Sequence, residues 1–127
     1  MLNKNNIKYG DIYKIDLGEQ VGSEQSGIKY CVVVQNNTGN IYSPTTIVCP
    51  ITRAVHKHVM KAKVPTHCHI EPNDKNNMIK PSIILCEQIR VVDKNRILEY
   101  YGALNYNEKI KMGKCLRISI PVKEEWL

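Results

Sequence analysis

A polar loop near the start of the chain carries two side chains of opposite charge. The segment Gly22–Lys29 reads Gly-Ser-Glu-Gln-Ser-Gly-Ile-Lys, so Glu24 is its one carboxylate and Lys29 its one cation. Glycine lets a backbone approach a ligand closely, and loops anchored on rigid strands often carry binding and catalytic groups. A carboxylate can accept a proton and an ammonium can stabilise developing negative charge, so this loop is a candidate reaction site.

The loop leads into the first of two predicted strands. Residues 28–35 and 45–52 are rich in β-branched and apolar side chains, and the segment 36–44 between them is dense in turn-forming residues. This pattern predicts a β-hairpin. The register of the hairpin then decides which residues of the two strands lie side by side.

One register brings a hydroxyl group close to the loop. If Gln35 pairs with Thr46, then Lys29 lies opposite Thr52, each six residues further from the turn. We therefore expect Glu24, Lys29 and Thr52 to gather at one end of the sheet. A slip of one residue would send one of the paired side chains to the other face, and that alternative stays open.

Several short motifs occur in a characteristic order along nearly the whole chain. They are Gly10–Tyr13 with Asp16–Leu17, Gly22–Gln25, Val34–Asn37 with Ser43–Thr45, Ile51–Thr52, and Leu85–Arg90 with Asp93–Lys94. Each is weakly specific alone, but their order resembles the MazF/PemK-type ribonuclease toxins of bacterial type II toxin–antitoxin modules. In this resemblance Thr52 matches the catalytic threonine. Two positions depart from the family pattern: Lys29 stands in place of arginine, and Tyr30 in place of the usual proline.

The resemblance implies a mostly β fold: an SH3-like, partly open barrel with a C-terminal helix. It also implies that residues 1–127 form one domain and that the protein is a homodimer. It implies the toxin of a type II system, a sequence-specific, metal-independent endoribonuclease that cleaves single-stranded RNA such as mRNA without a cofactor. The implied partners are this RNA and a cognate antitoxin protein, with operator DNA contacted only through the antitoxin complex. A disordered acidic antitoxin segment would suit the basic charge of this chain.

The three candidate side chains supply what RNA cleavage needs. A ribose 2′-hydroxyl can attack its own phosphodiester once it is deprotonated, the extra charge is stabilised and the leaving oxygen is protonated. Glu24 is the candidate general base, if partial burial makes it basic enough at neutral pH. Lys29 would stabilise the phosphorane or protonate the leaving oxygen, and Thr52 would donate a hydrogen bond to a phosphate oxygen. The alternatives are a solvent-facing Glu24 and Lys29, and a Thr52 selected for β-propensity alone.

Lysine in place of arginine is not a neutral change at such a site. A guanidinium holds two phosphate oxygens through a planar fork, whereas an ammonium is a compact point charge. We therefore expect Lys29 to weaken the nuclease while binding of RNA and antitoxin survives. Arg53 is a candidate replacement, although as the strand neighbour of Thr52 it is expected to face the other way.

Further residues are candidates for RNA binding. The segment Arg53–Lys63 carries several cations, Lys57 among them, and no carboxylate, so it would attract phosphates or simply be a solvated loop. Tyr42 could stack on a base or pack within its own loop. The resemblance adds three residues to the RNA-binding candidates: Gln25, Gln88 and Arg90.

Composition agrees with this interpretation. The formal net charge is +6 with a pI near 9.1, which favours polyanions without selecting one. The absence of a secretory apolar core or a membrane-length apolar run predicts a cytoplasmic protein without a membrane partner.

The five cysteines, spread singly, are expected to be core residues. Two His-x-His pairs, at 56/58 and 67/69, make a metal site conceivable, but convincing extra ligands are missing, so none is expected.

The remaining pattern predicts short strands followed by a helix. Strands are expected around 13–17 and over 66–71, 82–89 and 96–104, and Asn105 with Glu108 resembles a capping box before a helix. A second functional class stays open beside the nuclease: a noncatalytic SH3-like module that binds nucleic acid or an antitoxin peptide and, without the arginine, no longer cuts.

Overall fold

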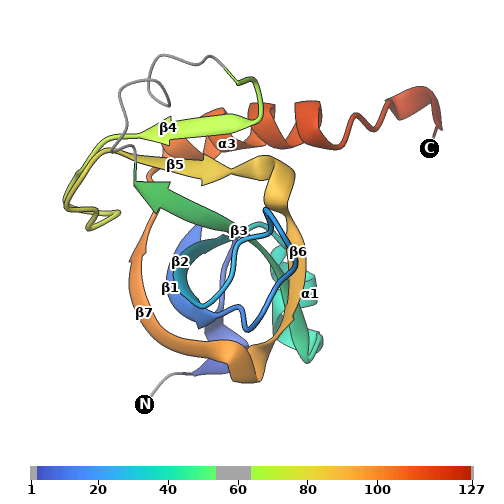
Figure 1. Ribbon diagram of the computed structural model, residues 1–127. Coiled ribbons are helices and arrows are strands. Elements are labelled where there is room, and N and C mark those ends of the chain that lie inside the picture. Colours follow the sequence, from blue (N-terminus) through green and yellow to red (C-terminus); the bar gives the residue numbers. More distant parts are fainter. Residues whose placement is uncertain (1–2, 54–63, 127) are drawn as a thin grey trace.

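The computed structural model describes residues 3–53 and 64–126, and Figure 1 shows a strongly curled antiparallel sheet with a helix at one side. Element labels follow Figure 1. The strands are β1 (Asp11–Asp16), β2 (Ile28–Val33), β3 (Thr45–Arg53), β4 (His67–Ile70), β5 (Ser82–Leu85), β6 (Arg90–Asp93) and β7 (Ile97–Ala103). The helices are α1 (Asn37–Tyr42) and α3 (Tyr106–Ser119), with 3-10 turns η1 (Lys4–Asn6), η2 (Cys86–Gln88), η3 (Lys94–Arg96) and η4 (Glu124–Trp126).

The sheet is open, and its main path of paired strands runs from β4 to β7. Its order is β4-β5-β3-β2-β1-β7, and β6 pairs with β3 off this path. The long strand β3 pairs with β6 along Thr45–Val48 and with β5 along Ile51–Arg53, so it belongs to both halves of the curled sheet. The predicted class, a mostly β and partly open barrel with a C-terminal helix, is confirmed.

Strand alternation builds two cores on the two faces of the sheet. Ile12 of β1 joins a cluster that includes Met112 and Cys115 of α3, whereas its neighbours Tyr13 and Ile15 join a second cluster on the other face. All five cysteines are free and buried, as predicted. The sheet is therefore held from both sides, which fixes the strand ends that carry the candidate residues.

Two predicted elements differ from the structure. The segment predicted as a turn contains α1, because the side chain of Asn36 accepts a hydrogen bond from the backbone of Gly39 and caps a helical turn. The strand predicted over 82–89 ends at Leu85, turns through η2 and resumes as β6. The break is needed because β5 and β6 pair with opposite halves of β3.

The C-terminal helix begins where the sequence predicts. Asn105 accepts a hydrogen bond from the backbone of Glu108, and the Glu108 side chain accepts one from the backbone of Asn105, which completes the capping box. The helix packs beside β4 and η2. Among the described residues, none of the helices combines the length and the apolar character needed to cross a lipid bilayer.

Candidate active site

The predicted strand register is present and brings Lys29 and Thr52 together. In the β2–β3 ladder Cys31 pairs with Pro50, and Val33 pairs with Val48. The same register, continued two residues past Cys31, sets Lys29 opposite Thr52. Both residues line one cleft of about 370 Å³ at the end of these strands.

We call this cleft the rim cleft; its lining residues are Lys14, Ile28, Lys29, Tyr30, Ile51, Thr52 and Arg53. Three of them are cations and none is a carboxylate. Lys14 lies 3.8 Å from Glu99, but both side chains are largely solvent-exposed, so this ion pair is weak. Arg53 lines the rim cleft beside Thr52, although alternation along β3 directs neighbouring side chains to opposite faces. The cleft therefore suits an anionic ligand such as a phosphodiester.

Glu24 lies in a different hollow, of about 430 Å³. We call it the loop hollow; it is lined by Gln20, Glu24, Gln25, Glu87, Gln88, Ile89, Arg90 and Val91. Glu24 is exposed, so the partial burial that the sequence interpretation required of a general base is absent in this structure. Of the three side chains expected at one point, the structure brings two into the rim cleft and leaves the carboxylate outside it.

Arg90 lines the loop hollow and is bonded to the β1–β2 loop. It pairs with Val48 of β3, and its Nη1 donates a hydrogen bond of 3.3 Å to the carbonyl oxygen of Leu17 at the base of the β1–β2 loop. Burial raises the pKa of the Cys31 thiol to about 12, and the positive charges of Arg90 and Lys29 oppose that rise. The guanidinium of Arg90 on β6 and the ammonium of Lys29 on β2 thus act on the same buried thiol, and both strands pair with β3.

The other RNA-binding candidates are divided between three places. Gln25, Gln88 and Arg90 share the loop hollow, where Nε2 of Gln88 donates to the carbonyl oxygen of Ser23 at 3.4 Å. Tyr42 is 81% exposed but belongs to α1, at the opposite end of β2 and β3 from Thr52. At about 3.3 Å per strand residue this is a separation on the order of 20 Å, so the structure does not bring Tyr42 to the rim cleft. Lys57 lies outside the described residues.

The sequence predicted Arg90 as an RNA-binding residue but not its place in the loop hollow, bonded to the β1–β2 loop. Its position follows from the pairing of β6 with the first half of β3, and that pairing requires the strand break after Leu85. The polar pair Glu87 and Gln88, within η2, is the signal in the sequence that marks this break.

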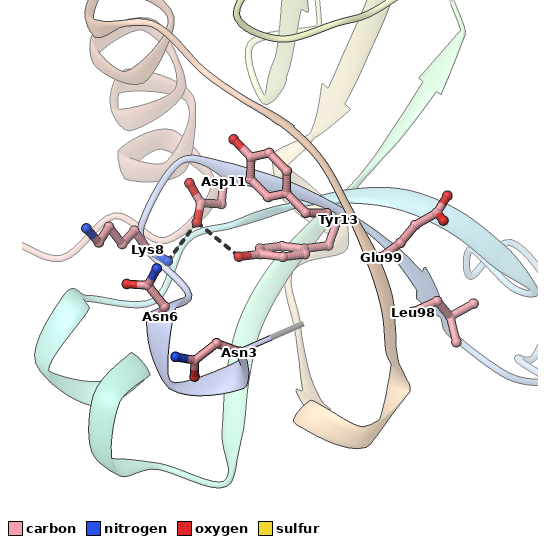
Figure 2. Close-up of a pocket in the computed structure, with 8 residues that line it drawn as sticks. Asn3, Asn6, Lys8, Asp11, Tyr13, Leu98 and Glu99 are labelled. Carbon is pink, nitrogen blue, oxygen red and sulfur yellow. Dashed lines mark hydrogen bonds between the residues drawn. The ribbon is translucent and has the colours of Figure 1, made fainter. Parts of the chain in front are cut away.

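A hollow larger than either the rim cleft or the loop hollow lies elsewhere in the described structure. It has a volume of about 660 Å³ and is lined by Asn3, Asn6, Lys8, Asp11, Tyr13, Leu98, Glu99 and Tyr100. Figure 2 shows Asp11 accepting hydrogen bonds from the Lys8 backbone at 3.0 Å and the Tyr13 hydroxyl at 3.1 Å. Burial raises the pKa of this carboxyl. None of the predicted site residues lines this hollow, whereas Lys29, Thr52 and Arg53 line the rim cleft, so we place the candidate site at the rim cleft instead.

The histidine pairs do not form a metal site in the described part of the chain. His67 lies 3.2 Å from Glu87, and no group of three His, Cys, Asp or Glu side chains converges among the described residues. The first pair, His56 and His58, lies outside the described residues.

The sequence of the chain is similar to that of known toxins. Residues 8–120 match the family described as "PemK-like, MazF-like toxin of type II toxin-antitoxin system". A relative named endoribonuclease MazF, from Staphylococcus epidermidis, is 45% identical over 114 residues, which cover 90% of this chain and 91% of the relative. A second endoribonuclease MazF, from Staphylococcus saprophyticus, is 44% identical over the same shares.

Solved structures share the fold at lower sequence identity. An endoribonuclease from a Mycobacterial species, solved in complex with its cognate antitoxin, has a TM-score of 0.71 at 18% identity and covers 91% of this chain and 96% of its own. MazF from Deinococcus radiodurans has a TM-score of 0.71, also at 18% identity and with the same coverage. These likenesses support the same curled sheet and terminal helix.

Proposed function

This chain belongs to the PemK-like, MazF-like toxin family of type II toxin–antitoxin systems, and we propose that its rim cleft is where it cleaves RNA. The chain is an endoribonuclease toxin, as its family and its MazF relatives indicate. One observation carries the placement of the site: Lys29 and Thr52 come together at the ends of two paired strands in a cleft lined by cations.

The proposed reaction uses the 2′-hydroxyl of the substrate as the nucleophile. This hydroxyl loses its proton and attacks the adjacent phosphorus, and the bond from phosphorus to the 5′-oxygen breaks. The products are a 2′,3′-cyclic phosphate and a 5′-hydroxyl, so atoms and charges balance without water or an external nucleophile. Each step needs only a proton acceptor, a proton donor and positive charge, all of which side chains can provide.

Lys29 and Thr52 act on the phosphate in this proposal. The Lys29 ammonium stabilises the charge that develops on the phosphoryl oxygens and protonates the leaving 5′-oxygen, and the Thr52 hydroxyl donates a hydrogen bond to a non-bridging oxygen. Both are partly buried on rigid strands, which holds them in position and strengthens their interaction with charge. Of the other cations, Arg53 borders the rim cleft and Arg90 the loop hollow, where each can hold a flanking phosphate.

Glu24 is the proposed general base, supplied from the loop hollow. Its loop runs from the end of β1 to the start of β2, and Glu24 precedes Lys29 by five residues in the chain. An exposed carboxylate on such a loop reaches the 2′-hydroxyl only when bound RNA spans both hollows. Gln25 and Gln88 would then contact nucleotides on the same side as Glu24.

The proposed partners follow from the family and from the surface of the chain. We propose single-stranded mRNA, cleaved at short sequence motifs in the cytoplasm, as substrate, and a cognate antitoxin as protein partner, with operator DNA bound only by the toxin–antitoxin complex. Exposed Ile110, Ile118 and Ile120, in α3 and just beyond it, support a homodimer through this helix. The family match over residues 8–120 supports one toxin domain.

Cleavage of an unstructured RNA in the presence of a metal chelator tests this function. We expect the wild-type chain to cut under these conditions and both Glu24→Ala and Thr52→Ala to lose most of the activity. Binding without cleavage at any enzyme concentration would instead establish the noncatalytic module as the function.

A further inference from the structure

A smaller hollow adjoins the rim cleft and extends it along the end of the sheet. It has a volume of about 70 Å³ and shares Tyr30, Ile51, Thr52 and Arg53 with the rim cleft. Its further lining residues are Met78, Ile79, Lys80, Ser82 and Tyr101. An RNA strand whose phosphate lies at Thr52 would therefore pass over the mouth of this second hollow.

Two tyrosine rings lie where the rim cleft meets the second hollow. Tyr30 of β2 and Tyr101 of β7 have ring centroids 4.3 Å apart, with an angle of 40° between the ring planes. Both are half-buried and pack against the core cluster shared with α3, and each ring also borders the second hollow. A partly exposed aromatic surface beside a cationic cleft is what stacking of a nucleobase requires.

The second ring is held rigidly in place. The Tyr101 hydroxyl donates a hydrogen bond of 2.6 Å to the carbonyl oxygen of Asn77, and Nδ2 of Asn77 donates one of 2.9 Å to the carbonyl oxygen of Tyr101. Asn77 has a φ of 58°, a left-handed conformation that is uncommon for a side chain-bearing residue. The loop also packs tightly on β7, since a Cβ at Gly102 would lie 2.7 Å from the carbonyl oxygen of Asn76. A ring held in place in this way can bind a ligand without losing much conformational entropy.

The charges around the tyrosines favour a polyanion. The two hollows together are lined by Lys14, Lys29, Arg53 and Lys80, and by no carboxylate. Cations on both sides of an aromatic platform match the alternation of phosphate and base along a single strand. An acidic peptide would satisfy the charges but would not make use of the flat ring surfaces.

We propose that Tyr30 and Tyr101 form a stacking subsite for the nucleobase next to the scissile phosphate, with Lys80 holding the phosphate beyond that base. This proposal rests on the proposed function, because it takes the phosphate position from Lys29 and Thr52. Tyr30 lines the rim cleft together with Lys29 and Thr52, so the platform adjoins the proposed reaction site. The stacking platform supplies binding free energy at a site where Lys29 cannot make the two-pronged contact with phosphate that an arginine makes.

The test measures binding of a fluorescently labelled, single-stranded 2′-O-methyl RNA, which cannot be cut by its own 2′-hydroxyl, using fluorescence anisotropy. We expect Tyr30→Leu to weaken binding about 5- to 150-fold, which corresponds to about 1 to 3 kcal/mol for one stacked base. Tyr30→Phe keeps the ring and should bind within about twofold of the wild type. Tyr106→Leu, at an exposed tyrosine of α3 outside both hollows, is the matched control.

A series of oligonucleotides, each with one base removed, separates stacking from damage to the fold. At one position of the series, removal of the base should weaken binding to the wild-type protein as strongly as Tyr30→Leu weakens binding of the intact RNA. Removal of that same base should not weaken binding to the Tyr30→Leu variant any further. Lys80→Gln should weaken binding and reduce the salt dependence by about one released counterion, about 0.7 in the logarithmic slope. The subsite would be overturned if the affinity losses from base removal and from Tyr30→Leu were additive. It would also be overturned if Tyr30→Phe and Tyr30→Leu weakened RNA binding equally.

The subsite and the proposed nuclease function fail in different ways. If Tyr30→Leu cuts and binds RNA like the wild type, the subsite is wrong while the nuclease stands. If the oligonucleotide series reveals stacking but no RNA is ever cut, the subsite stands and the chain is a binding module.

Discussion

The rim cleft and the loop hollow divide the chemistry of this protein between two kinds of structure. The rim cleft lies on paired strands backed by a core on each face, and it offers cations and a hydroxyl. The loop hollow lies under a glycine-flanked loop and offers the carboxylate of Glu24 beside the guanidinium of Arg90. The groups that stabilise negative charge thus lie on the rigid strands of the rim cleft. The proton acceptor, Glu24, lies on the loop, which has fewer buried contacts.

This division predicts that the two regions respond differently to substitution. A change in the rim cleft removes a fixed interaction with the phosphate and should act on the cleavage step itself. A change in the loop hollow alters a group that must be brought to the substrate, so its effect depends on RNA long enough to span both regions. The following substitutions test the distinction in order of expected effect.

Lys29→Ala should have the largest effect. Removing one well-placed electrostatic donor typically lowers a rate by about 10²- to 10³-fold, and we expect a loss in that range for the cleavage step. Single-turnover cleavage of labelled RNA at saturating protein measures it. Lys14→Ala is the matched control, since Lys14 lines the same cleft but is paired with exposed Glu99, and it should cost less than about tenfold. Equal losses in both variants would mean that only the overall charge of the cleft matters.

Glu24→Gln should cost about 10²-fold, the lower limit for general base catalysis, because Glu24 lies outside the rim cleft. The substitution keeps size and polarity but removes the proton acceptor. Rates measured on a short and a long oligonucleotide distinguish the two regions, because only the long RNA spans both and only it should show the full loss. A Glu24→Gln variant as active as the wild type on long RNA would remove the loop hollow from the reaction.

Lys29→Arg should raise the cleavage rate, by about tenfold. A guanidinium restores the two-pronged contact with phosphate that an ammonium lacks. The same single-turnover assay measures the gain, and an unchanged rate would show that the planar fork has no role in this cleft. The binding affinity for 2′-O-methyl RNA should change by less than the rate, because the added contact develops with the charge of the transition state.

The strand-borne half of the site could be predicted from the sequence, and the loop-borne half could not. The β2–β3 ladder ends with Cys31 opposite Pro50, and its register, continued two residues, sets Lys29 opposite Thr52, so the assumed pairing across the turn-rich segment was enough to bring them together. The position of Glu24 depends on how a loop of small residues settles against Gln88 and Arg90, which have no periodic relation to it. The break between β5 and β6 escaped prediction because Glu87 and Gln88 interrupt an otherwise apolar run from Ile83 to Ile89 only briefly, while pairing with both halves of β3 requires two separate strands.

Asn105→Ala should have the smallest effect on catalysis and provides a baseline for both regions. It removes the capping box of α3, far in the sequence from either hollow, and should lower the free energy of unfolding by about 1 kcal/mol. Chemical denaturation measures that loss, with Asn107→Ala on the exposed side of the same turn as the control. Cleavage per folded molecule should stay unchanged, and a drop in this rate would mean that helix stability, rather than local chemistry, controls the site.

Analysis of the RNA ends produced in the presence of a chelator tests the central claim most directly, because it reports the reaction carried out at Lys29 and Thr52. The account predicts 2′,3′-cyclic phosphate and 5′-hydroxyl ends from the wild-type chain, with their yield falling by at least about 10²-fold in the Lys29→Ala, Thr52→Ala double variant. Ends carrying 3′-hydroxyl and 5′-phosphate groups, or cyclic phosphate formed equally well by the double variant, would contradict it.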